Sequence, residues 1–372
     1  MKAILPRQDF QEALNAVATL TTGRTTRPIF KCVKLTGHEN HIELSATDGE
    51  VGLHLEVPVL SMKKPAEVVV RAERLVPVVR EMTDVEITLD ADDRYCTIHG
   101  EGSDIRLFVM DAADFPKVPV FEDEADLVID GADLRRMVGL TLYAAARETS
   151  RYAINGVLWQ KRGDQLFVVA TDGRRLARAG DKLGSASGGD FEAILPAKAM
   201  SVFERVFAAA SDGQEDKVDV KFLPNQVLLR SNQRVLSSVL VEGNFPKYEE
   251  VIPNEHDKVA RIDRDAFLGA VRRAALLTTE DSRAVKLAFE ESKLVITSQT
   301  PEEGDARVEI PISYEGETLA IGFNPAFLSD ALRVVPYEEV VFELHEAFRP
   351  GVLTGGNREE FLYVVMPVSL SQ

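Results

Sequence analysis

The chain has little cysteine: Cys32 and Cys96 are the only two among 372 residues. Two cysteines are too few for a disulfide framework, and both stand in apolar, alternating surroundings, so we expect small buried thiols in strands. No apolar run approaches the roughly 18 residues that a membrane-spanning helix needs. Lys2, Pro6 and Arg7 interrupt the N-terminus before any apolar region develops, so no secretion signal is predicted. These absences favour a cytoplasmic protein.

Sequence patterns of catalysis are also lacking. The chain has no Gly-x-x-x-x-Gly-Lys-Ser/Thr phosphate loop and no Gly-x-Ser-x-Gly elbow. Gly100-Glu101-Gly102 lacks the third glycine of a dinucleotide site. His38 and His41 are separated by two residues, but no cluster of Cys or carboxylates completes a metal site, and a solvated loop is the simpler interpretation. We expect no catalytic residue, no metal and no cofactor.

Positive charge is scarce, because 43 Lys and Arg stand against 60 Asp and Glu and leave a net charge of −17. That total argues against nucleic acid, since phosphate binding needs a basic surface. The distribution argues differently: six predicted helices together carry +3, so the rest of the chain carries −20. Exposed helices often carry Arg and Lys, yet a shared basic surface is the favoured interpretation, and it suits a loosely held partner. Its notable residues are Arg135, Arg136, Lys198, Arg205, Arg272 and Arg273.

An internal repeat organises the chain. Apolar residues at helical spacing predict helices over 7–20, 131–146 and 263–277, and further helices over 71–81, 197–209 and 325–334. An apolar strand follows each helix of the first set, over 29–35, 154–159 and 284–289. Three units of the same order are therefore predicted.

Two further signals mark the units. Ala46-Thr47-Asp48-Gly49 returns as Ala170-Thr171-Asp172-Gly173, while the third copy near Thr297–Thr300 is degenerate. We interpret this signal as a hairpin turn whose Asp bonds its own backbone and whose Gly takes positive φ, rather than as acid/base chemistry. Each unit closes on an apolar residue and a proline: Phe115-Pro116, Phe245-Pro246 and Met366-Pro367.

The predicted fold class is α+β, with three repeated domains over 1–121, 127–247 and 254–372. Runs such as 85–89 and 218–222 alternate apolar and polar residues with period two, as half-buried antiparallel strands do. Each domain is expected to pack two helices on antiparallel sheets. The acidic, irregular stretches 122–126 and 253–257 are the predicted linkers.

The whole chain resembles the bacterial sliding clamps, the beta subunits of DNA polymerase III. The matching landmarks, in order, are Arg24 before Pro28-Ile29, Ala112–Pro116, Arg151-Tyr152 before Asn155-Gly156, Val169–Ala177, Phe245–Tyr248, Ile321–Asn324 and Tyr363–Pro367. The resemblance implies sliding-clamp domains that close into a ring as a head-to-tail dimer, with helices lining a central hole. It also implies a processivity factor that holds duplex DNA topologically and without sequence preference.

The resemblance implies a hydrophobic peptide-binding cleft for the alpha subunit of the replicative polymerase, the clamp loader and other proteins that carry a clamp-binding motif. Its implied lining is Ile154, Thr171, Gly173, Arg174, Leu176, Pro246, Val251, Val364, Val365, Met366 and Pro367. The residues agree in kind, because Val364–Pro367 is apolar at a chain end, and Met adapts to several partners. Arg174 and Arg175 are expected to add polar contacts at the rim.

The implied DNA contacts are Arg24, Arg151, Tyr152 and Lys198, and the implied subunit contact joins Ile105 and Leu107 to Leu276 and Leu277. Ala153 stands where family members often have a second tyrosine, and Glu148 stands where a neutral polar residue is common.

Two other functions fit parts of the sequence. A repeat-built scaffold that binds proteins only would share the repeats and the cleft, but it needs neither a closed ring nor basic helices. An enzyme with a site scattered over loops would need a nucleophile and base, or a metal cluster, and the sequence offers no such pattern.

Overall fold

The computed structural model describes residues 1–122, 124–147, 153–184, 189–207, 216–278, 284–300 and 303–369. Arg151 and Tyr152, two of the expected DNA contacts, lie outside these ranges. The chain forms two compact units. The first contains Met1–Ala132 and Lys198–Leu240, and the second contains Asp133–Gly184, Gly189–Ala197 and Val241–Gln372.

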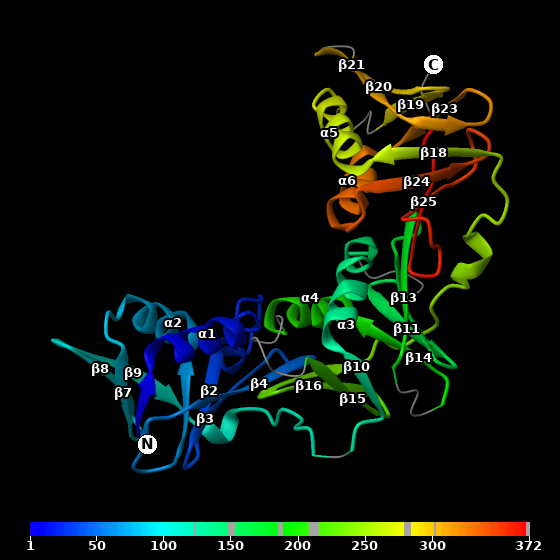
Figure 1. Cartoon of the computed structure of the whole chain (residues 1–372). Helices are drawn as coiled ribbons and strands as arrows, with labels where there is room; N and C mark the ends of the chain where they lie inside the picture. Colours follow the sequence, from blue (N-terminus) through cyan, green and yellow to red (C-terminus); the bar gives the residue numbers. More distant parts are fainter. Residues whose placement is uncertain are drawn as a thin grey trace. The chain divides into compact units, whose positions relative to one another are not determined.

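The same succession of elements occurs three times along the chain (Figure 1). The first copy contains β1 (Lys2–Pro6), α1 (Arg7–Ala18), η1 (Pro28–Lys31), β2 (Cys32–Gly37), β3 (His41–Thr47), β4 (Val51–Pro58), β5 (Ser61–Met62), β6 (Glu67–Arg71), α2 (Ala72–Glu81), β7 (Glu86–Ala91), β8 (Tyr95–Gly100), β9 (Ser103–Met110) and η2 (Ala112–Asp114). The second contains β10 (Leu127–Asp130), α3 (Gly131–Gly139), η3 (Leu142–Ala144), β11 (Gly156–Arg162), β12 (Gln165–Thr171), β13 (Arg175–Lys182), β14 (Phe191–Pro196), α4 (Ala197–Val206), β15 (Lys217–Leu223), β16 (Gln226–Ser231), β17 (Arg234–Val239) and η4 (Tyr248–Val251). The third contains β18 (Lys258–Asp263), α5 (Arg264–Ala275), β19 (Val285–Glu290), β20 (Lys293–Thr300), β21 (Gly304–Pro311), β22 (Ser313–Glu315), β23 (Leu319–Phe323), α6 (Pro325–Val334), β24 (Glu339–Leu344), β25 (Gly351–Thr354) and β26 (Phe361–Val365).

One antiparallel sheet runs through the first unit. Its described strands follow the order β10-β15-β16-β17-β4-β3-β2-β6-β9-β8-β7-β1-β5. The pairing of β17 with β4, in which Leu236 is opposite Leu53, joins strands of the second copy to those of the first. Helices α1 and α2 pack side by side, and α1 covers β3 and β4 (Figure 1).

The second unit contains a second joint of this kind, in which strands of two successive copies pair. Its described strands form a sheet of order β14-β11-β12-β13-β26-β25-β24-β18-β22 and a second sheet of order β21-β20-β19-β23. Here β13 of the second copy pairs with β26 of the third. Helices α5 and α6 lie side by side, and α5 packs on β20 and β21 (Figure 1). The second copy is thus divided between the two compact units, because its strands continue into sheets of both neighbours.

The hairpin turns form as the sequence predicts. Gly49 and Gly173 have positive φ, and the carboxylates of Asp48 and Asp172 each accept two backbone N–H bonds from the residues that follow. Thr300 is the equivalent, in the third copy, of the threonine that begins each hairpin turn. Strand β20 ends at Thr300 and β21 begins four residues later, which is the same spacing as in the first two copies. Its hydroxyl donates to the Leu277 carbonyl at 2.6 Å, a bond that the sequence pattern does not reveal.

Several element bounds differ from the prediction. The strand expected from residue 29 begins at Cys32, because Pro28 starts a short 3-10 turn with its fixed φ. The helix expected over 131–146 ends at Gly139, after which the Thr141 hydroxyl bonds back to the Met137 carbonyl at 2.8 Å. Helix α5 begins at Arg264, since the Asp263 side chain caps it through the Ala266 N–H.

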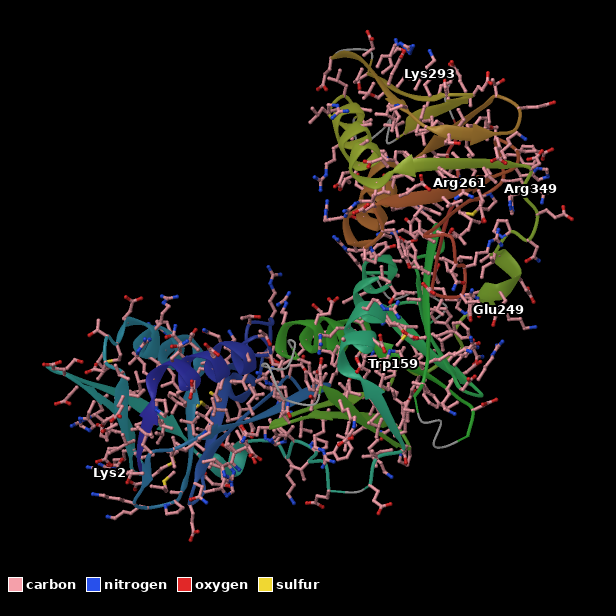
Figure 2. All side chains as sticks on the ribbon, viewed as in Figure 1. Lys2, Trp159, Glu249, Arg261, Lys293 and Arg349 are labelled. Atoms are coloured by element: carbon pink, nitrogen blue, oxygen red, sulfur yellow. The ribbon has the colours of Figure 1, made fainter. Side chains whose placement is uncertain are left out.

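The apolar residues that predicted helix faces are buried: Phe10, Leu14 and Val17 on α1 are fully enclosed. Trp159 on β11 is also fully buried (Figure 2). Both thiols are free and buried as predicted, and burial raises the pKa of Cys32 to about 11 and that of Cys96 to about 12. Neither thiol is therefore ionised near neutral pH.

Candidate functional site

The joint between β13 and β26 brings two distant parts of the expected cleft together. Leu176 is opposite Val364 in the antiparallel register, and the Met366 N–H donates to the Arg174 carbonyl at 3.0 Å. The strand that follows the Thr-Asp-Gly turn of the second copy therefore lies beside the last strand of the chain. Leu176 and Val364, which are 188 positions apart in the sequence, are thus immediate neighbours.

Most strand residues of the expected lining are enclosed rather than open. Leu176 and Val364 are each 2% exposed and share an apolar cluster with Leu158, Val169 and Leu362. Thr171 and Val365 are buried as well, while Ile154 and Pro246 are half-buried. These side chains form a packed support beneath the surface.

Two apolar members of the expected cleft do reach solvent: Val251 is 53% exposed and Met366 is 43% exposed. Both line a hollow of about 490 Å³. The opposite wall comes from the turn between β24 and β25, where His345, Arg349 and Pro350 stand. That turn also carries Phe348, which is 73% exposed. This wall is not predicted from the sequence, because the turn has no apolar periodicity.

The charges around this hollow are mixed. Glu250 and Glu255 line it together with Arg349 and His345, and the His345 Nδ1 lies 2.9 Å from the carboxylate of Asp257. Hydrogen bonds from Lys258 and His345 lower the pKa of Asp257 to about 2, so this carboxylate is ionised at neutral pH. The hollow thus offers an apolar floor between polar rims, the usual composition of a site for an extended peptide.

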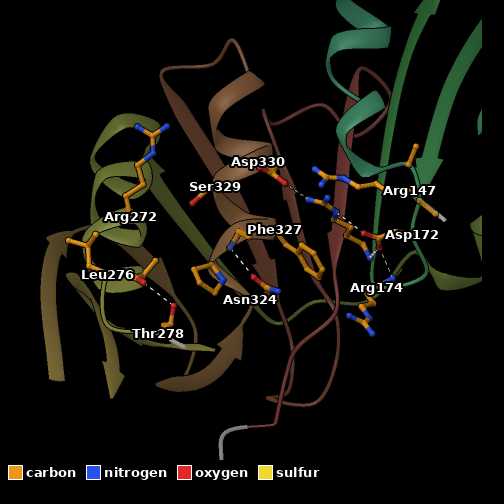
Figure 3. A pocket seen from close by; sticks show the side chains of 16 residues that line it. Arg147, Asp172, Arg174, Arg272, Leu276, Thr278, Asn324, Phe327, Ser329 and Asp330 are labelled. Atoms are coloured by element: carbon orange, nitrogen blue, oxygen red, sulfur yellow. Dashed lines mark hydrogen bonds and ion pairs between the residues drawn. The ribbon is translucent and has the colours of Figure 1, made fainter. Parts of the chain in front are cut away.

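A second hollow of about 770 Å³ begins on the other side of Arg174 (Figure 3). It is lined by residues 145–147, the Thr-Asp-Gly turn, the end of α5 and the start of α6. Phe327 and Asn324 stand near its centre, with Arg147 and Arg174 on one wall and Arg272 on the other (Figure 3).

Arg175 does not reach the rim, so the prediction that it adds rim contacts is wrong. Its guanidinium bonds Asp172 at 3.0 Å, Asp330 at 2.8 Å and the Tyr143 carbonyl at 2.8 Å, and it stacks 4.5 Å from the Phe327 ring centroid. Burial alone would lower the pKa of Arg175, but the bond to Asp330 and the interactions with Tyr363 and Asp172 together outweigh burial and raise this pKa above its ordinary value. Arg175 joins the second copy to α6 of the third.

Of the expected DNA contacts within the described residues, Arg24 is exposed after the end of α1. Lys198, at the start of α4, is exposed but forms an ion pair with Asp48 of the first hairpin turn. That carboxylate is half-buried, and bonds from Lys198 and from the backbone hold its pKa below the ordinary value in spite of burial. The positive charge of Lys198 is therefore partly neutralised by a carboxylate of its own chain.

The expected subunit contacts lie at two sheet edges. Ile105 and Leu107 are half-buried on β9, whose residues 103–108 pair with β8 alone among the described strands. Leu276, at the end of α5, is 78% exposed, and Leu277 beside it is half-buried. Helix α5 packs on β21, which pairs only with β20 among the described strands.

Two further findings concern metal sites and membrane-spanning helices. In the described ranges, no three His, Cys, Asp or Glu side chains cluster as metal ligands would, and the rings of His38 and His41 stack 4.5 Å apart. Within the same ranges, no helix is long and apolar enough to cross a membrane.

Comparison with known proteins identifies the repeats. Three family models match in succession: the N-terminal, central and C-terminal domains of the DNA polymerase III beta subunit match residues 1–119, 128–247 and 249–369. The beta sliding clamp of Pseudomonas aeruginosa is 29% identical and that of Escherichia coli K12 is 28% identical, each over the full length of both chains.

Solved structures agree with the sequences. A sliding clamp from Pseudomonas aeruginosa bound to griselimycin has a TM-score of 0.92 at 29% identity, with full coverage of both chains. The beta subunit from Thermotoga maritima has a TM-score of 0.91 with full coverage, and at 24% identity it supports the fold alone. The predicted fold of three repeated clamp domains is confirmed. The chain belongs to the family of DNA polymerase III beta subunits, the beta sliding clamps.

Proposed function

We propose that this protein is a DNA sliding clamp and processivity factor, which encircles duplex DNA as a homodimeric ring and tethers the replicative polymerase. One observation carries the ring: both joints between repeats are made in the same way. In each, the strand after the hairpin turn of one copy, β4 or β13, pairs with the last strand of the next copy, β17 or β26.

The equivalent strands at the two ends are β21 of the third copy and β9 of the first, and each has an open edge within the described residues. A second chain that repeats the joint would pair its β9 with β21 and its β21 with β9. Such a head-to-tail contact closes on itself after two chains, so that the open edges of β9 and β21 are both covered. Ile105 and Leu107 with Leu276 and Leu277 are the apolar residues that we place in this contact.

Encirclement resolves the conflict between the net charge of −17 and a nucleic acid partner. A closed ring retains duplex DNA by topology, so it needs only weak, sequence-independent attraction from exposed basic groups. We propose Arg24, Arg151, Tyr152 and Lys198 as these contacts. The protein is then a non-catalytic, cytoplasmic accessory subunit without a cofactor, built from domains over 1–121, 127–247 and 254–372.

The joint substitution of Arg24 and Arg151 by Gln tests the DNA contacts. We expect the double variant to remain a dimer but to be retained less well on circular DNA. Binding to short duplexes should become less dependent on salt. The magnitude of the negative slope of log affinity against log salt should decrease by roughly 2, since each lost phosphate contact removes about 0.9.

The matched control for that experiment replaces two basic residues near sheet hairpins by Gln: Arg162, which is exposed, and Lys293, which is half-buried. It removes the same charge and should leave the salt slope unchanged. Tight, sequence-specific binding of a short duplex by the parent protein would contradict the proposed mode of binding.

We propose the surface around Met366 and Val251, supported by Leu176 and Val364, as the peptide-binding cleft. The full proposed set adds Ile154, Thr171, Gly173, Arg174, Pro246, Val365 and Pro367. Two exposed apolar side chains beside a hollow, on a packed support, suit the one or two apolar anchors that carry most of the affinity of an extended peptide. The proposed partners are the polymerase alpha subunit, the clamp loader and other proteins with a clamp-binding motif.

Truncation of Met366 to Ala tests the cleft. We expect affinity for a glutamine-led peptide with leucine and phenylalanine anchors to fall by about 1–2 kcal/mol, the scale of a typical interface anchor. Fluorescence anisotropy measures the affinity, and circular dichroism checks the fold. Leu60→Ala, an equally simple truncation of an exposed apolar residue in the first unit, is the control. Equal affinities for Met366→Ala and the parent would place the cleft elsewhere.

A repeat-built scaffold without DNA passage, the alternative function weighed from the sequence, is not favoured by the family match. The two functions differ in one measurement, which is retention on closed circular DNA and loss after the circle is cut. A ring slides off the free end of a linear DNA molecule, whereas a scaffold is retained equally on circular and on linear DNA. Loss at equal rates from both forms would overturn the proposed function.

A further inference from the structure

We infer that the charges on the exposed faces of the two open sheet edges set the register of ring closure, and that they restrict the partner of this chain to a second chain with the same order of charges. This inference rests on the proposed ring, because it specifies how the β9 edge of one chain meets the β21 edge of the next. Its grounds are the register of the two joints inside the chain, the charges that this register brings together and the packing around Gly304.

The two joints inside the chain share one register. In the first joint, Leu236 on β17 is opposite Leu53 on β4. In the second joint, Tyr363 on β26 is opposite Ala177 on β13. Leu53 and Ala177 each lie six residues after the end of the preceding strand, which is β3 or β12. The same count from the end of β20 leads to Ala306 on β21, so Ala306 is the corresponding residue of the third copy.

The last strand of each copy has a landmark of its own, a backbone contact with the strand that leads into the second helix of that copy. The residues that make this contact are Val241 in the second copy, Val368 in the third and Met110 in the first. Leu236 and Tyr363 lie five residues before their landmarks, and the same count before Met110 leads to Ile105 on β9. A subunit contact of the same register therefore places Ile105 opposite the partner's Ala306.

This register brings opposite charges together on the exposed face of the sheet. Arg106 stands opposite the partner's Asp305. Asp104 stands opposite the partner's Arg307. All four side chains are exposed in the single chain, and opposite residues of an antiparallel pair point to the same face. A slip of two residues in one direction sets Arg106 against Arg307, and a slip in the other direction sets Asp104 against Asp305. Because like charges directly opposite each other destabilise a strand pair, the charges select the register of the internal joints.

The opposite face of the same strands agrees with this register. It places Leu107 opposite the partner's Gly304, which has no side chain to fill the space. Leu277 lies beside this point, because its carbonyl accepts a bond from the Thr300 hydroxyl at 2.6 Å and Thr300 pairs with Gly304. Leu107 of one chain thus meets Leu277 of the next. The register taken from the internal joints therefore leads to the same apolar contact that we proposed for the ring.

The pair of Arg106 and Asp305 has the groups that are free to form it. Among the residues that the structure describes, neither side chain forms an ion pair. Arg106 lies 5.0 Å from the centroid of the Tyr95 ring, a cation–π contact that leaves its N–H donors available. Asp104 and Arg307 already have ion-pair partners in their own chain. Arg106 and Asp305 are therefore expected to contribute most to the choice of register.

The test uses two full-length variants, Arg106→Asp and Asp305→Arg, each alone and then mixed in equal amounts. Each variant alone meets like charges at both contacts of a homodimer, so its dissociation constant should rise by about tenfold. In a dimer of one variant with the other, an acidic side chain faces a basic one at both contacts. The mixture should therefore recover the dissociation constant of the parent, and the mixed dimer should predominate over both homodimers. Sedimentation velocity measures dissociation, and native mass spectrometry distinguishes the mixed dimer.

Arg261→Asp, at an exposed arginine on β18 away from both edges, is the matched control and should dimerise as the parent does (Figure 2). Recovery in the mixture also separates charge from folding, because neither the Tyr95 contact nor any other lost contact is restored there. If both single variants dimerise as the parent does, the inference is overturned and the ring stands. If both weaken and the mixture does not recover, the two residues do not face each other and the register is wrong. A parent protein that is monomeric would overturn the ring and the inference together.

Discussion

Leu276→Asp together with Leu277→Asp is expected to convert the dimer into monomers at micromolar concentration. Leu276 is 78% exposed in the single chain, an unusual position for a large apolar side chain at the end of a helix. In the proposed ring this leucine packs against the partner's first repeat. The substitution therefore removes apolar burial and also places a carboxylate in the subunit contact.

The effect is expected to be large because the ring contains the contact twice. Loss of one buried leucine costs about 2 kcal/mol, and an unpaired charge in a desolvated contact costs several kcal/mol more. With two contacts for each dimer, the dissociation constant should rise by more than about 10⁴-fold, since each 1.4 kcal/mol is a factor of ten. Loading onto circular DNA should be lost with it.

Sedimentation velocity measures the change, from a particle of twice the 41.1 kDa chain to one chain. Leu60→Asp introduces one carboxylate at an exposed leucine in the first unit, which matches the single variant Leu276→Asp in charge, and should leave the dimer intact. The single variant Leu276→Asp separates assembly from folding, because its side chain is exposed in the chain whereas Leu277 is half-buried. A parent protein that sediments as a stable monomer would exclude the ring.

Periodic features could be predicted from the sequence, because they depend on residues that are close together along the chain. The repeated helices follow from apolar residues at helical spacing, and the hairpin turns at Asp48 and Asp172 follow from side chains that bond their own backbone. The sequence places the third turn two residues too early, because this turn lacks Asp and Gly. Only the strand spacing, with β20 ending at Thr300, reveals it.

Contacts between distant residues could not be predicted in this way. Arg174 and Arg175 are the same residue type side by side, yet one is exposed and the other enclosed. Successive side chains in a strand point to opposite faces, and the sequence does not show which face meets Asp330, 155 positions away. Lys198 resembles a free basic residue until Asp48 is placed beside it. Charge counted along a sequence therefore overestimates the charge available to a ligand.

Arg175→Met is the substitution with the largest expected effect on folding. Methionine keeps much of the apolar stem, but it leaves Asp172 and Asp330 without their shared donor and the Tyr143 carbonyl without its bond. Removing one partner from a largely enclosed ion pair typically costs 3–5 kcal/mol; because Asp330 is partly exposed, we expect about 3 kcal/mol here. For a unit of this size the melting temperature should fall by roughly 6–12 °C.

The same variant should weaken the proposed cleft, because Arg175 is the residue opposite Val365 where β13 joins β26. Hydrogen exchange at the amides of β26 should quicken, and peptide affinity should fall with it, since both report opening of that joint. Arg174→Met is the matched control: its exposed guanidinium supports no such network, so the melting temperature and exchange should stay as in the parent. Adding Asp330→Asn to Arg175→Met should cost less than the two single losses combined, because the carboxylate left unpaired by the first change is neutralised by the second. Strict additivity, or an unchanged melting temperature for Arg175→Met, would show that the joint is held by its strands and apolar cluster alone.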